Sequence, residues 1–125
     1  MTFLQMSALC LALGLGASAS AANVDGDVER GRRIHSGEET IPGVAACSSC
    51  HGADANQTIA PMYPRLAGQY PDYLVHTLQA YKSGARKSAV MQPTATALSE
   101  RDMADVAAYF GSLNGSIDDL SRVIR

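Results

Sequence analysis

Residues 47–51 read Cys-Ser-Ser-Cys-His, and this segment has the clearest chemical potential in the 125-residue chain. A Cys-x-x-Cys-His segment is the attachment signature of a c-type haem. Its spacing lets the thiols of Cys47 and Cys50 each add to one of the two vinyl groups of a haem. The adjoining His51 is then carried over the haem face, where its Nε2 atom reaches the iron. The segment therefore predicts one covalently bound haem c.

Three other uses of a cysteine pair compete with haem attachment. A redox-active Cys-x-x-Cys of the thioredoxin type needs strands alternating with helices, and no such pattern is visible. A zinc site needs four ligands, but His35 and His76 lie 12 residues before Cys47 and 25 residues after His51, each without a neighbouring ligand. A plain disulfide accounts for the thiols and leaves His51 without a role. Haem attachment is the interpretation that uses all three residues.

The second axial position of the iron decides whether the haem only transfers electrons or also binds small ligands. Met103 falls on the apolar face of the last expected helix and is predicted to be a core residue. Met62 follows His51 by only 11 residues, which leaves little chain to reach the opposite haem face, whereas Met91 follows it by 40. We therefore predict Met91 as the second axial ligand, with Met62 and His76 as the alternatives.

The chain shows helical periodicity and no alternating strand pattern. Helices are expected over residues 27–36, 73–84 and 99–113, where apolar residues recur at helical spacing between capping residues and glycines. The segments 38–69 and 85–98 contain the Gly, Pro and Thr residues and are expected to be loops. Long loops in a small domain usually serve a function. The sequence thus predicts an all-α fold with three main helices and long loops wrapped around one haem.

Residues 1–21 have the layout of a secretory signal peptide. An apolar run is followed by Ala19-Ser20-Ala21, which matches the small-x-small rule and places the cleavage before Ala22. The first 29 residues contain no Lys or Arg, so the usual basic leader is missing and an uncleaved membrane anchor is the alternative. The apolar run of about a dozen residues is short of the roughly 20 that span a bilayer. We expect export to the periplasm and a single monohaem domain over residues 22–125.

The composition is that of a globular domain. Hydrophobic residues make up 46% and charged residues 18% of the sequence, which separates it from disordered chains. The 12 acidic residues outnumber the 10 basic ones, and the formal net charge is −2, so no basic excess indicates a nucleic-acid partner. His35 lies at the end of the first expected helix, where the helix dipole favours a cation, and we assign it no chemistry.

Several short segments on either side of the haem motif match, in order, the pattern of one family of small haem proteins. They are Gly31 with Ile34, Cys-Ser-Ser-Cys-His-Gly at 47–52, Pro-Arg-Leu-Ala-Gly-Gln at 64–69, Tyr73-Leu74, Leu78, Gly84-Ala85-Arg86, Met91 and the helix up to Leu113. Through them the chain resembles class I c-type cytochromes, most of all small bacterial monohaem cytochromes and single halves of the dihaem c-four type. Because only one Cys-x-x-Cys-His is present, a dihaem protein is excluded.

The resemblance implies roles for further residues. The Pro64 carbonyl accepts the remaining ring proton of His51, which fixes the histidine tautomer and strengthens it as a ligand. The family pattern also places its second iron ligand at Met91. Leu66 is expected to line the haem pocket. The other expected lining residues are Leu74, Leu78, Tyr81 and Leu98.

A haem held between His51 and Met91 has no vacant position for a substrate. We therefore predict an electron-transfer protein that is not an enzyme and that exchanges single electrons with larger redox proteins as donor and acceptor. One alternative is a haem subunit of a larger periplasmic dehydrogenase, for example one that oxidises sulfur compounds or alcohols. Another is a small-ligand sensor whose sixth ligand is weak or absent.

The charged residues also allow a prediction about partner binding. Arg65, Lys82, Arg86 and Lys87 fall in segments expected to border the haem edge, whereas acidic residues are concentrated near the termini. We hypothesise that the four basic residues form a docking rim that steers association with redox partners and makes its rate fall with added salt. The alternative is that these charges only keep the surface hydrated.

Overall fold

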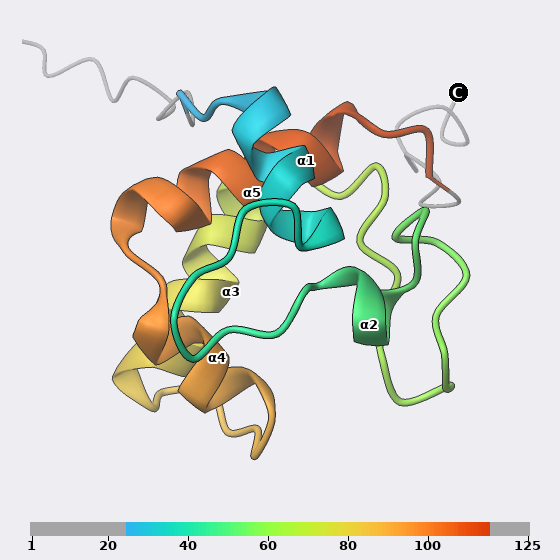
Figure 1. The fold of residues 1–125 in the computed structure, drawn as a ribbon. Coiled ribbons are helices and arrows are strands. Elements are labelled where there is room, and N and C mark those ends of the chain that lie inside the picture. The colour runs from blue at the N-terminus through green and yellow to red at the C-terminus, as the bar shows by residue number, and fades with distance from the viewer. Residues whose placement is uncertain (1–24, 116–125) are drawn as a thin grey trace, which may run out of the picture.

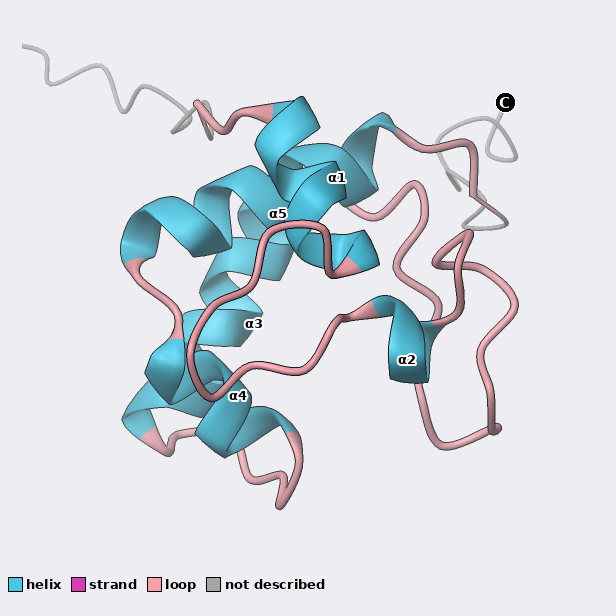
Figure 2. Cartoon of the chain, viewed as in Figure 1, coloured by secondary structure: helices cyan, strands magenta, loops and turns pink. Residues whose placement is uncertain are grey.

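The computed structural model describes residues 25–115, and within this range it contains helices and no strand (Figures 1 and 2). This confirms the predicted all-α fold class. The predicted signal peptide and the last ten residues lie outside the described range. The helices are α1 (Val28–Ser36), α2 (Ser48–His51), α3 (Pro71–Ser83), α4 (Met91–Ala97) and α5 (Glu100–Ser112).

The three longer helices, α1, α3 and α5, are the three that periodicity predicted, while α2 and α4 lie in segments predicted to be loops. α2 is a single turn and too short for periodicity to detect. α4 contains Pro93, but in the first turn, where a proline is tolerated because the backbone N–H groups have no partner within the helix. Thr94 and Thr96 donate their hydroxyl groups to the carbonyls of Val90 (3.0 Å) and Gln92 (2.8 Å).

α1 packs across α5, and glycine permits this close crossing. The Asp27 side chain caps α1 by accepting a bond from the Arg30 backbone N–H at 3.0 Å, and Gly37 ends the helix with φ of 85°. A Cβ atom on Gly31 would lie 2.0 Å from the carbonyl oxygen of Asp105 in α5. A larger residue at position 31 would therefore push the two helices apart.

An ion-pair cluster joins α1 to α5 at the same crossing. The guanidinium of Arg30 donates to Asp105 at 2.7 Å, to Asp102 at 2.6 Å and to Glu39 at 2.7 Å. The Asp105 side chain is fully buried, and it also accepts bonds from the Asp27 backbone N–H (2.7 Å) and from Arg101 (3.2 Å). The cluster therefore holds the start of α1 and the first two turns of α5 together.

α5 begins with a capping box, in which the Ser99 side chain accepts from the backbone of Asp102 while Asp102 accepts from the backbone of Ser99. It ends at Ser112, one residue before the predicted end at residue 113. Gly115 passes so close to Ala67 that a Cβ atom would lie 1.6 Å from the Ala67 carbonyl oxygen. A bond from Gly68 N to Phe110 O (2.9 Å) fixes the same loop on α5.

The buried apolar residues form two clusters, with α3 in contact with both. In the first, Leu74 packs with Ile34, Val106 and Phe110 around the crossing of α1 and α5. In the second, Ala95, Leu98 and Met103 are buried between α4 and α5, with Leu78 and Tyr81 of α3 packed against them. Within residues 25–115 no helix is long and apolar enough to cross a membrane.

Candidate haem site

The two cysteines and the histidine of the motif lie on one tight turn of backbone. Cys47 precedes α2, and its carbonyl oxygen accepts bonds from Cys50 N at 3.2 Å and His51 N at 2.9 Å. Gly52 then ends the turn with φ of 85°, and a Cβ atom there would lie 2.0 Å from the Gln57 carbonyl oxygen. The turn thus places both thiols and the imidazole within five consecutive residues, Cys47 to His51.

The imidazole of His51 has a defined tautomer. His51 is 6% exposed, and its Nδ1 atom lies 2.8 Å from the carbonyl oxygen of Pro64. A carbonyl oxygen only accepts hydrogen bonds, so Nδ1 carries the proton and Nε2 carries the lone pair. A lone pair on Nε2 is the state that a metal ligand requires.

The thiols are free and differ in their surroundings. Cys47 and Cys50 are not joined in a disulfide. Burial raises the pKa of the Cys47 thiol to about 11, so this thiol is neutral at neutral pH. A hydrogen bond between Cys50 and the hydroxyl of Tyr63 raises the pKa of Tyr63, and the Tyr63 ring packs edge-on to His51 with centroids 6.1 Å apart.

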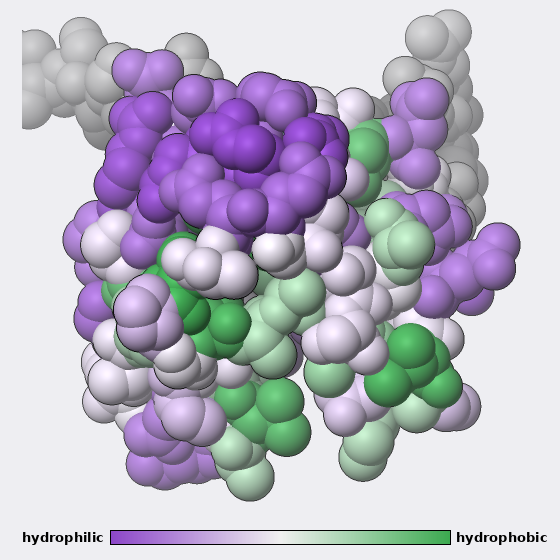
Figure 3. All heavy atoms as spheres, in the orientation of Figure 1, coloured by the Kyte–Doolittle hydropathy of each residue, from purple (hydrophilic) through white to green (hydrophobic). Residues whose placement is uncertain are grey.

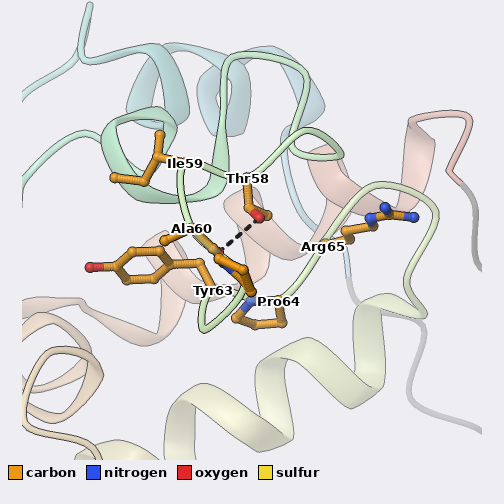
Figure 4. Close-up of a pocket in the computed structure, with 7 residues that line it drawn as sticks. Thr58, Ile59, Ala60, Tyr63, Pro64 and Arg65 are labelled. Carbon is orange, nitrogen blue, oxygen red and sulfur yellow. Dashed lines mark hydrogen bonds between the residues drawn. The ribbon is translucent and has the colours of Figure 1, made fainter.

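The loop that supplies the Pro64 carbonyl also forms an open hollow of about 540 Å³ (Figure 4). Thr58 stabilises the loop by donating its hydroxyl to the Ala60 carbonyl at 3.0 Å. In the space-filling view, apolar residues lie on both sides of a hollow in the lower half of this face, and hydrophilic residues cover α1 above it (Figure 3). The residues lining the loop hollow are Thr58, Ile59, Ala60, Pro61, Tyr63, Pro64 and Arg65.

The three methionines considered as second ligand lie in different surroundings. Met103 is fully buried in the cluster between α4 and α5, as predicted for a core residue. Met62 is 80% exposed on the loop that follows α2. Met91 is half-buried at the first residue of α4, and its backbone N–H donates to Ser88 at 3.0 Å. In Figure 1, α4 lies at the lower left and α2 at the right. His76 is exposed on α3.

Comparison with known proteins identifies the family. The sequence model described as "Cytochrome c" matches residues 28–114. The chain belongs to the cytochrome c family. The resemblance to a class I cytochrome is thereby confirmed, and this cytochrome carries haem c covalently through the Cys47 and Cys50 pair.

Three relatives refine the placement within the family. Cytochrome c-554(548) of Halomonas halodenitrificans is 45% identical over 80 residues, which are 62% of this chain and 92% of that protein. A thiosulfate dehydrogenase electron acceptor of Stutzerimonas stutzeri is 44% identical over 78 residues, which are 62% of this chain and 36% of that protein. The solved cytochrome c4 of Acidithiobacillus ferrooxidans is 35% identical with a TM-score of 0.64, over 69% of this chain and 49% of that one.

These relatives confirm two predictions. The chain corresponds to about half of the cytochrome c4 structure, as expected for one half of a dihaem protein. The relatives are cytochromes and an electron acceptor, in agreement with an electron carrier that is not an enzyme. The chain nevertheless spans only about a third of the electron acceptor and half of the cytochrome c4 chain.

The structure also places the apolar residues expected near the haem. Leu66 is half-buried against the first core cluster, and its backbone N–H donates to Ala55 O at 2.8 Å. Leu74 belongs to the same cluster, whereas Leu98 is buried in the second, with Leu78 and Tyr81 packed against it. These residues therefore divide between the two apolar clusters, and their place against the haem stays a prediction.

The sequence placed His35 where the helix dipole favours a cation, and no chemistry was assigned to it. In the structure the His35 side chain is buried, with 2% of it exposed. Burial is the main cause that lowers its pKa. A signal for its burial was present, because His35 follows Gly31 by four residues and therefore lies on the same face of the helix.

Proposed function

We propose that this cytochrome is a periplasmic carrier of single electrons whose haem iron is bound by His51 and Met91. The observation that carries the proposal is the 2.8 Å bond from His51 Nδ1 to Pro64 O, which presents the Nε2 lone pair beside two free thiols. When bound, the haem supplies an iron that alternates between the ferrous and ferric states. Residues 1–21 are proposed to be the signal that directs residues 22–125 to the periplasm.

The chain's own residues support electron transfer in two ways. Pro64 holds the imidazole of His51 in a fixed tautomer and orientation, so the ligand need not rearrange when the iron changes charge. The buried apolar side chains of Leu74 and Leu98 restrict access of water, which keeps the response of the solvent to electron transfer small. Met91 is proposed as the second ligand because Met103 is committed to the core and Met62 is exposed to solvent.

The proposed docking surface combines exposed apolar residues with basic ones. Ile59 and Met62, on the loop after α2, are 65% and 80% exposed. The basic residues proposed as the rim are Arg65, Lys82, Arg86 and Lys87, and all four are exposed. Two of them are held in place, since Lys82 donates to Leu98 O at 2.5 Å and Arg86 lies 5.0 Å above the ring of Tyr81.

A second candidate function is favoured by the 44% identity to a thiosulfate dehydrogenase electron acceptor. In this case the cytochrome would receive electrons from an enzyme that oxidises thiosulfate, either as a free carrier or as a bound haem subunit. The two functions share the haem site and differ in whether the partner stays bound. Co-purification with a larger subunit would favour the bound form.

Electron transfer measured by stopped flow tests the proposal and the docking rim together. We expect thiosulfate dehydrogenase to reduce the oxidised cytochrome at a rate that falls as salt is added, because opposite charges on the partner steer association. Lys87→Gln should lower that rate several-fold at low salt. Arg32→Gln, a neutralisation of equal size on α1, should leave it unchanged. A rate independent of salt and of Lys87 would refute the docking rim, and failure to exchange electrons with any redox protein would refute the carrier.

A further inference from the structure

The imidazole of His35 lies in the interior between α1 and α5. Its ring contacts Phe110 edge-on, with centroids 5.3 Å apart and an interplanar angle of 85°, and it contacts Tyr109 at 5.3 Å and 39°. These contacts occur at the helix crossing that also contains Gly31. Packing alone explains an aromatic ring at this position, but it does not explain the two ring nitrogens.

One of the nitrogens reaches the backbone that follows the haem motif. His35 Nε2 lies 3.1 Å from the carbonyl oxygen of Ala53, two residues after His51. Since the carbonyl only accepts, Nε2 carries the proton and donates it. The bond connects α1 to the chain directly where it leaves the turn that contains Cys50 and His51.

The other ring nitrogen of His35, Nδ1, is in an energetically unfavourable position. With the proton on Nε2, the Nδ1 atom carries a lone pair, and it is buried without a hydrogen-bond partner in the described part of the chain. A buried polar atom without a partner is unfavourable and uncommon in folded proteins. A phenylalanine would fill the same space without that cost, so the bond to Ala53 is the contribution that only the histidine makes.

The segment held by this bond is tied to the haem turn by further backbone bonds. Ala55 N donates to Gly52 O at 3.0 Å, and Ile59 N donates to Cys50 O at 3.2 Å. The Ala55 carbonyl in turn accepts bonds from Leu66 N and Ala67 N at 2.8 and 3.0 Å. Movement of Ala53 would therefore be transmitted both to the turn with His51 and to the loop that carries Pro64.

We propose that His35 is a positioning residue, whose neutral imidazole ties the backbone after His51 to the crossing of α1 and α5 and so maintains the orientation of the haem-attachment turn. The proposal rests on the proposed role of His51 as an iron ligand. It assigns a task to a residue that neither binds the haem nor lies at the docking surface.

The charges around His35 are consistent with a neutral ring. Burial is the largest influence and lowers its pKa. Asp54 opposes this effect through its negative charge. Tyr109, the ionisable group that faces the ring from α5, has a pKa raised by burial and is uncharged at neutral pH.

The neutral state can be tested on the unmodified holoprotein. In the reduced, diamagnetic cytochrome, nitrogen chemical shifts should show His35 with its proton on Nε2 and uncharged at pH 6.5, where an unperturbed histidine is half protonated. A proton on Nδ1, or a charged ring at that pH, would overturn the proposal. This measurement requires no variant and needs a sixth iron ligand without depending on which residue supplies it, so the His35 proposal can fail while the proposed electron carrier stands.

Two variants separate the hydrogen bond from the packing. His35→Phe keeps an aromatic ring and removes the donor, whereas His35→Gln supplies an amide N–H in its place. We expect the amides of Ala55 and Ile59 to exchange about five- to tenfold faster in the Phe variant, as for loss of one hydrogen bond, and to recover in the Gln variant. The electron paramagnetic resonance signal of the oxidised haem should shift and recover in parallel, while the amide of Leu74 in α3 is the internal control.

The remaining outcomes decide against a positioning role. Unchanged exchange in the Phe variant would make His35 a packing residue. Faster exchange with an unchanged haem signal would restrict its effect to the local backbone, and failure of the Gln variant to restore either measurement would exclude the donated bond as the cause. If neither variant folds, the chemical shifts of the unmodified protein decide the question.

Discussion

Replacing Met91 with alanine should remove the weak far-red methionine–iron absorption band of the oxidised cytochrome and lower its reduction potential. The thioether ligand stabilises the ferrous iron and thereby raises the potential, so its loss favours the ferric state. The same replacement should let carbon monoxide bind the reduced protein at neutral pH, because a coordination position becomes open. Absorption spectra of both oxidation states, with and without carbon monoxide, measure all three effects.

Met62→Ala is the matched control for this prediction. Met62 is 80% exposed on the loop after α2, so the variant should keep the band, the potential and the closed iron site. A band that persists in Met91→Ala would contradict the proposed ligand pair. The second ligand would then have to be Met62 or His76, and the exposed position of each would require the chain to rearrange. Carbon monoxide binding to the unmodified protein would favour the small-ligand sensor.

Sequence reasoning succeeded where chemistry and structure depend on residues close together in the chain. The distance between two haem vinyl groups fits thiols three positions apart, so Cys47, Cys50 and His51 were recognisable without a fold. The bond from His51 to Pro64 O joins residues only 13 positions apart, within one loop that the family resemblance covered. α5 could be predicted because its cap at Ser99 and its apolar face at Met103, Val106 and Phe110 are both local patterns.

Contacts between segments that are far apart in the sequence could not be predicted in this way. Arg30 pairs with acids 72 and 75 positions away, and no local pattern links residues so far apart in the sequence. The burial of His35 likewise depends on where α5 crosses α1. The local pattern of either helix does not specify which residues meet at such a crossing.

The pH dependence of the unfolding free energy gives a further test of His35, which lies at the crossing of α1 and α5. Because burial lowers the pKa of the folded His35, the unfolded chain binds a proton that the folded chain resists. The stability that this residue contributes is thus complete above the unfolded pKa of about 6.5 and is lost as the pH falls towards the folded pKa. His35→Phe should show a shallower fall in unfolding free energy over this range. Equal slopes for the two proteins would indicate that folding does not lower the pKa of His35.

The largest loss of stability is expected for Asp105→Ala. This change removes the buried carboxylate that accepts from Arg30, Arg101 and the backbone of Asp27. Removing one partner from a buried ion pair costs about 3–5 kcal/mol, mainly because the remaining groups lose their compensation. Arg30 is partly exposed and keeps Asp102 and Glu39 as partners, so we expect a loss of about 3 kcal/mol. Denaturant unfolding of the holoprotein, followed by circular dichroism, measures it.

Glu29→Ala provides the comparison, since Glu29 is an acid on α1 that pairs with Arg32 and Arg33 at the surface. Its side chain is 62% exposed, and exposed ion pairs contribute little to stability because water and salt screen them. The unfolding free energy should therefore change much less than in Asp105→Ala. Equal losses in the two variants would mean that the cluster around Arg30 acts as an ordinary surface network. A larger loss in Asp105→Ala alone would identify the buried carboxylate as the main polar link between α1 and α5, the crossing on which His35 and the haem-attachment turn both depend.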